Sequence, residues 1–254
     1  MGLLKDRNVV VTGVLTERSI AFQIASAVLA EGADLVITTF ARVRRHTERA
    51  ARRLPVSVPI LDLDVTAPED FQRLAGDLRD RWGRVDGVVH SIAHGFGTAM
   101  GTSILEFERG DVQSTFQVSA VSFAELARAM APLMERGGSI VGLDFDARFA
   151  WPGYNWMGVA KAALESSTHY LARDLGPLGV RANLIAAGPV RSVAASAVPG
   201  FADIQAKWDK RAPLGWHGDT TAVARCAVAL LSDLLPATTG EIIHVDGGAH
   251  CVAA

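Results

Sequence analysis

The stretch N-V-V-V-T-G-V, residues 8–14, decides the fold predicted for this chain. It is an apolar, β-branched run that ends in glycine, as is typical of a strand buried on both faces of a parallel sheet. A helix should follow it, because Ser19 is a good N-cap residue. The apolar residues that recur on one face of that helix are Ile20, Ile24 and Val28. A buried strand followed by an amphipathic helix is the repeating unit of an α/β domain.

The same alternation continues to the end of the chain. Further apolar runs predict strands at 34–40, 58–65, 87–93, 139–145, 180–187 and 241–245. Helical patterns lie between them at 42–54, 68–82, 111–134, 153–175 and 219–231. Strands that alternate with helices form parallel sheets covered on both faces. We therefore expect residues 1–254 to form a single α/β domain, a Rossmann-like, doubly wound parallel sheet of about seven strands.

Composition and charge exclude several classes of protein. The chain has 254 residues, 49% of them hydrophobic, which indicates a large apolar core. Its formal net charge of −2 argues against a nucleic-acid partner, and a solvated helix face explains the six arginines within 42–54. It has no 18-residue apolar run and no apolar signal region at its start, and Cys226 and Cys251 fit no metal or disulfide spacing. We expect a cytoplasmic protein with no metal site and no membrane association.

The strongest catalytic signal is W-P-G-Y-N-W-M-G-V-A-K, residues 151–161. Lys161 follows Tyr154 by seven positions, close to two helical turns of about 3.6 residues, so both side chains should share a face. A phenol beside an ammonium group suits the polarisation or protonation of a substrate oxygen. The other tyrosine, Tyr170, would project from the opposite face. A tyrosine and a lysine on one helix are commonly surface residues without a function. The evidence for a catalytic pair therefore depends on the surrounding sequence.

The first strand-to-helix turn lies where a dinucleotide-binding fingerprint would be, but only Gly13 matches the pattern. Leu15 and Arg18 stand at the later glycine positions. A lone glycine there can also serve a plain turn. The helix N-terminus at Ser19 still offers N–H groups and the positive end of a dipole to a pyrophosphate.

Two later segments could also contact a dinucleotide. Asp64 and Val65, at the end of the third predicted strand, could bracket an adenine edge, or Asp64 could simply cap the next turn. In A-A-G-P-V-R-S after the sixth strand, Gly188 could let backbone approach a ligand and Ser192 could donate to a phosphate. Equally, Pro189 could merely end the strand.

In this order the segments resemble the enoyl-[acyl-carrier-protein] reductases, a branch of the short-chain dehydrogenase/reductase superfamily, and are most similar to the NADH-dependent mycobacterial type. The resemblance covers essentially the whole chain. Its most specific feature is the six residues between Tyr154 and Lys161, where ordinary superfamily members have three. The segments that carry it are V-T-G-V-L-T-E-R-S-I-A (11–21), L-D-V (63–65), V-V-H-S-I (88–92), G-S-I-V-G-L-D-F-D (138–146), Y-N-W-M-G-V-A-K (154–161), A-A-G-P-V-R-S (186–192), W-D-K-R-A-P-L-G-W (208–216) and L-P-A-T-T-G-E-I-I-H-V-D-G-G-A-H (235–250).

The resemblance implies reduction of the trans-2 double bond of an enoyl thioester on acyl carrier protein, the last step of fatty-acid elongation. Tyr154 would hydrogen-bond the thioester oxygen, and Lys161 would hold the nicotinamide ribose hydroxyls. Phe145 would lie beside the nicotinamide, unless it is a core aromatic, and Met157 would line the substrate pocket. A substrate-binding loop and helix at about 192–212 and a homotetramer are also expected. With the turns above, the predicted cofactor-binding residues are Gly13, Leu15, Ser19, Ile20, Phe40, Asp64, Val65, Ser91, Ile92, Ala93, Lys161, Gly188, Val190 and Ser192.

The residues and the family resemblance point to different cofactors. The second predicted strand ends T-T-F-A-R-V-R-R, with no acidic residue to bind a ribose 2′-OH and with Arg42, Arg44 and Arg45 close by. The residues alone therefore favour NADPH. The resemblance favours NADH, because Phe40 matches an aromatic residue that covers the adenosine end in NADH-using relatives. We expect NADH, with NADPH as a weaker alternative.

Three questions stay open at this point. Another short-chain reductase, acting on a ketone or imine, is disfavoured by the Tyr-to-Lys spacing, and a non-catalytic dinucleotide sensor by the intact pair. Ala93 and His94 stand where the family commonly has Gly and an aromatic residue, which leaves the shape of the nicotinamide pocket undecided. Lys207, Lys210 and Arg211 would form one basic helix edge, suited either to an acidic carrier protein or to plain solvation.

Overall fold

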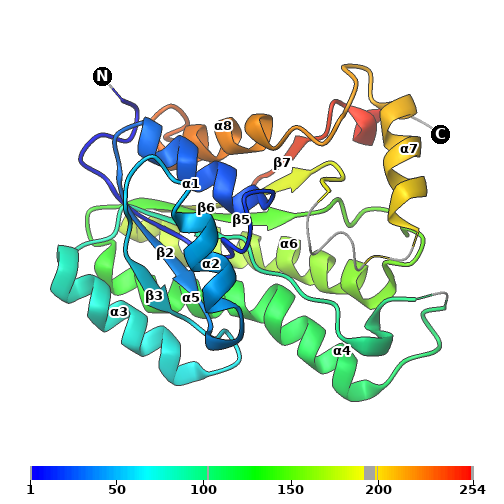
Figure 1. Cartoon of the computed structure of the whole chain (residues 1–254), viewed down its shortest axis with the longest axis horizontal. Coiled ribbons are helices and arrows are strands. Elements are labelled where there is room, and N and C mark those ends of the chain that lie inside the picture. The colour runs from blue at the N-terminus through cyan, green and yellow to red at the C-terminus, as the bar shows by residue number, and fades with distance from the viewer. Residues whose placement is uncertain (1, 102, 192–197, 199, 253–254) are drawn as a thin grey trace.

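The predicted parallel sheet is confirmed. The computed structural model describes residues 2–101, 103–191, 198 and 200–252. Seven strands pair in parallel in the order β3-β2-β1-β4-β5-β6-β7 (Figure 1). They are β1 (Asn8–Val11), β2 (Asp34–Thr39), β3 (Ile60–Asp62), β4 (Gly87–His90), β5 (Gly138–Asp144), β6 (Val180–Ala187) and β7 (Ile242–Val245). The order reverses between β1 and β4, and open α/β sheets bind ligands at such a point, outside the carboxyl ends of their strands.

Alternation along β1 explains why helices cover both faces. Val9 and Val11 are fully buried in one apolar core and Val10 in the other. The first core is covered by α1 (Ile20–Ala30), α2 (Arg44–Ala51) and α8 (Thr220–Leu231). The second is covered by α3 (Pro68–Trp82), α5 (Ser122–Met130) and α6 (Asn155–Leu175) (Figure 1). The doubly wound prediction is therefore confirmed.

Helix ends follow the sequence signals closely. Ser19 caps α1 by accepting a hydrogen bond from Phe22 N, and Asp219 caps α8 through Thr221 N and Ala222 N. Helix α3 starts with Pro68 and ends at Trp82, where Gly83 caps it in a left-handed conformation. The basic residues expected near 207–211 lie on α7 (Phe201–Arg211). No helix among the described residues is long and apolar enough to cross a bilayer.

Three strand predictions were clearly too long, and one of them is the strand predicted at 87–93, which stops at His90. The first strand stops at Val11 rather than Val14, because Gly13 turns the chain with a φ of +80°. The third covers only Ile60–Asp62 of the predicted 58–65, because β3 is an edge strand that pairs with β2 alone. The long α6 begins at Asn155, and Tyr154 is its cap residue rather than a residue of its first turn.

The uninterrupted helix predicted at 111–134 was also wrong. The structure has α4 (Arg109–Phe116), a π-helical turn at Gln117–Val121, α5, and a short 3₁₀ turn at Ala131–Leu133. A π turn inserts an extra residue into the helix and occurs frequently at functional sites. This one lies beside the segment that follows β4.

Candidate active site

The carboxyl ends of β1 and β4 meet at the reversal point. A Cβ on Gly13 would lie only 2.0 Å from the carbonyl oxygen of Ser91. The Thr12 hydroxyl donates to Val89 O at 3.1 Å and accepts from Ser91 N at 3.1 Å. Close approach of two backbones, as well as its positive φ, therefore requires glycine at position 13.

Helix α1 brings its N-terminus to this junction through the turn that contains Leu15. The Ser19 hydroxyl accepts from Phe22 N at 3.2 Å and donates to Thr16 O at 2.7 Å. The first amides of a helix have no partner inside the helix, so those of Ile20 and the next residue can bind an anion. This end of α1 suits a pyrophosphate group without a glycine-rich loop.

Phe40 and Asp64 are both predicted to contact an adenosine. They differ in whether the side chain already has hydrogen-bond partners within the protein. Phe40 directly follows β2 and is 39% exposed. Asp64 accepts hydrogen bonds from both Thr66 N and Thr66 Oγ1, at 2.9 and 2.7 Å. The turn-capping role raised for Asp64 is therefore present in the structure. Contact between adenine and Asp64 or the buried Val65 stays a prediction.

The segment after β4 is held by the π turn. Ser119 Oγ accepts from His94 N at 3.0 Å and donates to His94 O at 3.3 Å. The His94 ring packs edge-on against Phe96 with centroids 4.4 Å apart. Ser91, Ile92 and Ala93, which precede it, are half-buried. The residue at the family's aromatic position thus folds onto a neighbouring aromatic ring.

Tyr154 lies against the end of β5. Its ring contacts Phe145 edge-on, with centroids 5.3 Å apart. Phe145 directly follows β5 and also contacts Trp151 and Trp208, at 5.3 and 5.4 Å. It is only half-buried, so it joins the core to the site instead of lying wholly inside the core. Met157, in the first turn of α6, is buried.

Lys161 reaches the same end of β5. Its Nζ donates to Leu143 O at 2.8 Å, and the residue is 4% exposed. Tyr154 packs against Phe145, two positions further along the chain from that acceptor. The two side chains therefore share one face of α6, as their spacing predicts. Among the described residues the Tyr154 hydroxyl has no hydrogen-bond partner, which leaves it available to a ligand.

Several buried ionisable groups surround this pair. Burial raises the pKa of Tyr154, and the charge of Asp144 raises it further. Burial lowers the pKa of Lys161, against the opposing effect of Asp144 and Glu165. Burial, and then the charge of Lys161, lowers the pKa of His90 to about 3, so this imidazole is neutral. The Tyr154 phenol therefore keeps its proton and can donate a hydrogen bond throughout the neutral pH range.

Indole rings occupy the other side of Phe145. Trp151 and Trp208 lie 4.8 Å apart between centroids, and Trp208 joins α7 to this loop. A Cβ on Gly188 would lie 2.6 Å from Trp216 Nε1 and 3.0 Å from Trp208 Nε1. The missing side chain of Gly188 therefore makes room for this chain's own indoles, and a ligand contact there stays a prediction. Val190 is buried nearby, and Ser192 lies outside the described residues.

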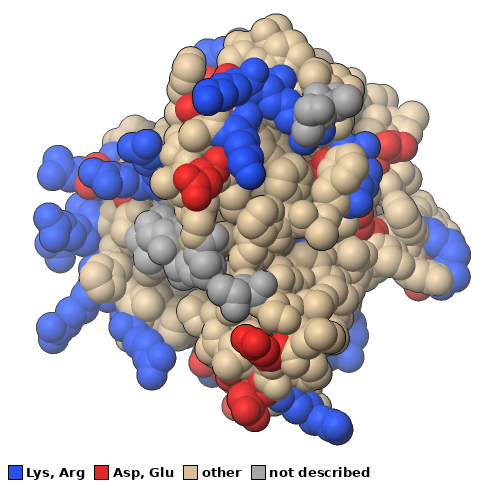
Figure 2. Space-filling model, turned by 90° about the vertical axis from the view of Figure 1, so that its right-hand side faces the viewer, with Lys and Arg blue, Asp and Glu red and all other residues tan. Residues whose placement is uncertain are grey.

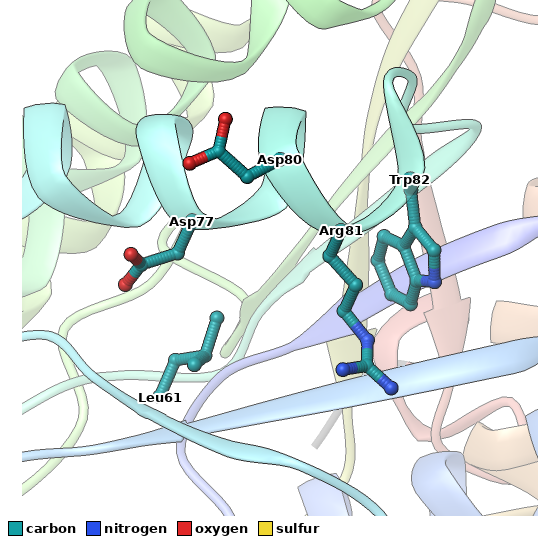
Figure 3. A pocket seen from close by; sticks show the side chains of 5 residues that line it. All are labelled: Leu61, Asp77, Asp80, Arg81 and Trp82. Carbon is teal, nitrogen blue, oxygen red and sulfur yellow. The ribbon is translucent and has the colours of Figure 1, made fainter.

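One surface hollow lies near these residues, and another lies far from them. A hollow of about 660 Å³ lies at the outer edge of the sheet, between Leu61 of β3 and side chains of α3 (Figure 3). Three strands, β2, β1 and β4, separate that edge from β5. The other, of about 530 Å³, adjoins the N-terminus of α1. Its lining residues are Glu17, Arg18, Gln23, Val190, Arg191, Gln205, Asp209, His217, Gly218 and Thr220.

Reasoning from the sequence missed three residues of this cluster. In the sequence, Asp144 is simply the acid near the end of a predicted strand. Trp151 and Trp208 likewise lie in a loop and a helix without a functional signal of their own. The segments G-S-I-V-G-L-D-F-D and W-P-G-Y do place an acid and an aromatic residue next to Phe145 and Tyr154. That adjacency was the available signal. Among the described residues, no three His, Cys, Asp or Glu side chains are arranged to hold a metal ion.

Comparison with known proteins agrees with this geometry. A family model described as Enoyl-(Acyl carrier protein) reductase matches residues 13–250. An enoyl-[acyl-carrier-protein] reductase [NADH] of Mycolicibacterium smegmatis is 47% identical over 98% of this chain and 97% of its own. The corresponding protein of Mycobacterium avium is 45% identical, with the same coverage of both chains. A reductase [NADPH] of Staphylococcus aureus is 37% identical over 98% of both chains. With a doubly wound sheet and a Tyr154–Lys161 pair at the end of β5, this chain belongs to the enoyl-[acyl-carrier-protein] reductase family.

Proposed function

We propose that this protein reduces the trans-2 double bond of enoyl thioesters carried by acyl carrier protein, with NADH as reductant. This reaction is the last step of the fatty-acid elongation cycle. The observation that supports it best is the convergence of Tyr154, Phe145 and Lys161 at the carboxyl end of β5. Full-length relatives that are named for this activity give independent support.

The residues present suit a dinucleotide. The α1 N-terminus and Ser19 would hold the pyrophosphate, Phe40 would cover the adenosine, and Lys161 would hold the nicotinamide ribose. The crevice beside Gly13 lies where α/β sheets bind such ligands. When bound, NADH supplies a hydride to C3 of the enoyl chain.

Tyr154 provides the main contribution of the protein's own side chains to the reaction. As C3 is reduced, negative charge develops on the thioester oxygen, and the Tyr154 hydroxyl donates a hydrogen bond to it. Its raised pKa keeps the phenol protonated, so it stabilises the enolate as a donor. The resulting enolate would then take up a proton at C2 from solvent. Phe145 and Met157 would form apolar walls beside the reacting carbons.

Turnover of enoyl thioesters with NADH tests this function directly. We expect trans-2-enoyl thioesters to be reduced and the matched 3-ketoacyl thioesters to be left unchanged. Turnover of the ketone alone would assign the protein to another short-chain reductase activity. NADH binding without turnover of either substrate would support a dinucleotide sensor.

NADH should be preferred over NADPH by about tenfold or more in kcat/KM, with residual NADPH activity. Arg44, one of the three arginines after β2, is already paired with Asp62 at 2.6 Å and with Glu48 at 3.2 Å. It is therefore less free to bind a 2′-phosphate, while Phe40 takes up space that this phosphate needs. Measuring kcat/KM for both cofactors checks the preference. Phe40→Ala should narrow it, and a tenfold advantage for NADPH in the unaltered protein would contradict it.

Basic residues on α7 suit docking of an acidic carrier protein. Figure 2 shows the side of the molecule on which α7 lies, with Lys and Arg side chains in its upper part and others along its left edge. Lys207 and Lys210 are exposed, whereas Arg211 donates to Val252 O and holds the C-terminal segment. The two lysines are therefore the freer part of the predicted edge.

Substituting Lys207→Ala and Lys210→Ala together should raise KM for a carrier-protein substrate several-fold and leave KM for a coenzyme A substrate unchanged. The reason is lost electrostatic attraction, so the difference should disappear at high salt. Steady-state kinetics with both substrates measures it. Arg79→Ala with Arg81→Ala, two exposed cations on α3, is the control for net charge. An equal loss on both substrates would rule out docking at this edge.

The proposed assembly is a homotetramer, and the proposed location is the cytoplasm. Val121 and Val159 are exposed apolar side chains on the neighbouring π turn and α6, which supports a homotetramer built through this surface. Analytical ultracentrifugation tests the stoichiometry. Cys226 and Cys251 are both free thiols, which fits a reducing cytoplasm.

A further inference from the structure

Asp144 is a buried acid at the centre of the site to which the reaction assigns no role. It ends β5, is 6% exposed, and pairs in register with Ala186 of β6. Within the described residues, both carboxyl oxygens are fully buried and lack a hydrogen-bond partner. Buried carboxylates normally have such partners, so this arrangement needs a compensating charge or a donor.

The opposite charge that acts on Asp144 is that of Lys161, although no direct ion pair joins the two side chains among the described residues. The ammonium group of Lys161 bonds to Leu143 O, the carbonyl directly before Asp144 in the chain. The groups that face Asp144 are Lys161 and Glu165 of α6 and the phenol of Tyr154, and His90 of β4, which is neutral, also faces Lys161. Burial raises the pKa of Asp144, the charge of Lys161 opposes this rise, and the charge of Glu165 adds to it. Burial lowers the pKa of Lys161, and the charges of Asp144 and Glu165 oppose that fall. The buried acid and the buried base thus depend on one another.

We propose that Asp144 is a positioning residue whose buried carboxylate keeps the ammonium group of Lys161 charged and directed to the end of β5. The inference rests on the proposed function, which gives Lys161 the nicotinamide ribose. A neutral lysine amine would bind the ribose hydroxyls more weakly than an ammonium ion does. Asp144 therefore sets the pH range over which the cofactor binds tightly.

Glu165 is the natural comparison for Asp144. It lies one turn after Lys161 on the same helix and is half-buried, so solvent screens its charge more strongly. Its Oε1 accepts from Ala147 N at 3.2 Å, which gives it a local structural role. Glu165→Gln removes one negative charge from the same neighbourhood and leaves the buried carboxylate in place.

The test is NADH affinity by fluorescence titration between about pH 6 and 10 for Asp144→Asn. In the unaltered protein, NADH affinity should fall as pH rises through the lowered pKa of Lys161. Without the negative charge, burial lowers that pKa further, so the fall should move to lower pH by about one unit or more. Glu165→Gln should move it less. In Lys161→Arg, whose cation does not titrate in this range, Asp144→Asn should cause no shift.

Two results would contradict a positioning role for Asp144. One is an unchanged pH profile in Asp144→Asn, and the second is a loss of NADH affinity that is equal at every pH. If that variant does not fold, Asp144→Ser removes the same charge with a smaller side chain and is judged by the same shift. Failure of the unaltered protein to reduce enoyl thioesters would overturn the proposed activity, whereas the pH shift in NADH binding would still be observed.

Discussion

Replacing Tyr154 with Phe should lower kcat for an enoyl thioester by about 100-fold or more, with a much smaller change in KM. The substitution removes only the hydroxyl. The ring stays in its contact with Phe145, so the shape of the site is kept. The lost hydrogen bond acts on charge that is absent in the bound substrate and develops during hydride transfer. A transition-state interaction of this kind appears in kcat and corresponds to about 2.7 kcal/mol or more.

Steady-state kinetics at saturating NADH measures this effect, and the chain supplies a matched control. Tyr170 is the other tyrosine, lies on the same helix and is 58% exposed. Tyr170→Phe makes the same chemical change away from the site and should leave kcat unchanged. A Tyr154→Phe variant that keeps half of the original kcat would remove Tyr154 from the mechanism.

Replacing Lys161 with Ala should weaken NADH binding by about 10- to 100-fold, the usual range for hydrogen bonds made by a charged group. The ammonium group is fully inside the site and already aimed at the end of β5. Because burial lowers its pKa, the unaltered protein should lose affinity as pH rises through that lowered value. The alanine variant should bind weakly at every pH and show no such step.

Fluorescence titration of NADH across pH measures both features. Lys5→Ala, at an exposed lysine before β1, is the control for loss of one positive charge. Thermal unfolding of each variant shows whether the fold is kept, because Lys161→Ala leaves Asp144 without its compensating charge. An unchanged NADH affinity in Lys161→Ala would make Lys161 a purely structural residue.

Local physics made much of the fold predictable. β-branched runs such as Val9–Val11 form buried strands because their side chains pack on both faces, and Ser19 and Pro68 mark helix starts because of their own backbone chemistry. The boundaries that failed depend on distant partners. The strand at Ile60–Asp62 is short because only β2 lies beside it, and the π turn at Gln117–Val121 has no strong signal in its own residues.

The features of the candidate site also fall into those set by local sequence and those set by distant contacts. The sequence by itself determined the order of strands and helices, and the seven-residue step that places Tyr154 and Lys161 on one face, because both follow from short-range backbone geometry. Only the tertiary structure decided that Ser91 closes over Gly13, that indoles fill the space beside Gly188, and that Asp144 is buried beside Lys161. These depend on which strands become neighbours and on how much water the packed helices exclude. Burial sets the pKa of Lys161 and Asp144, and burial is a property of the assembled core.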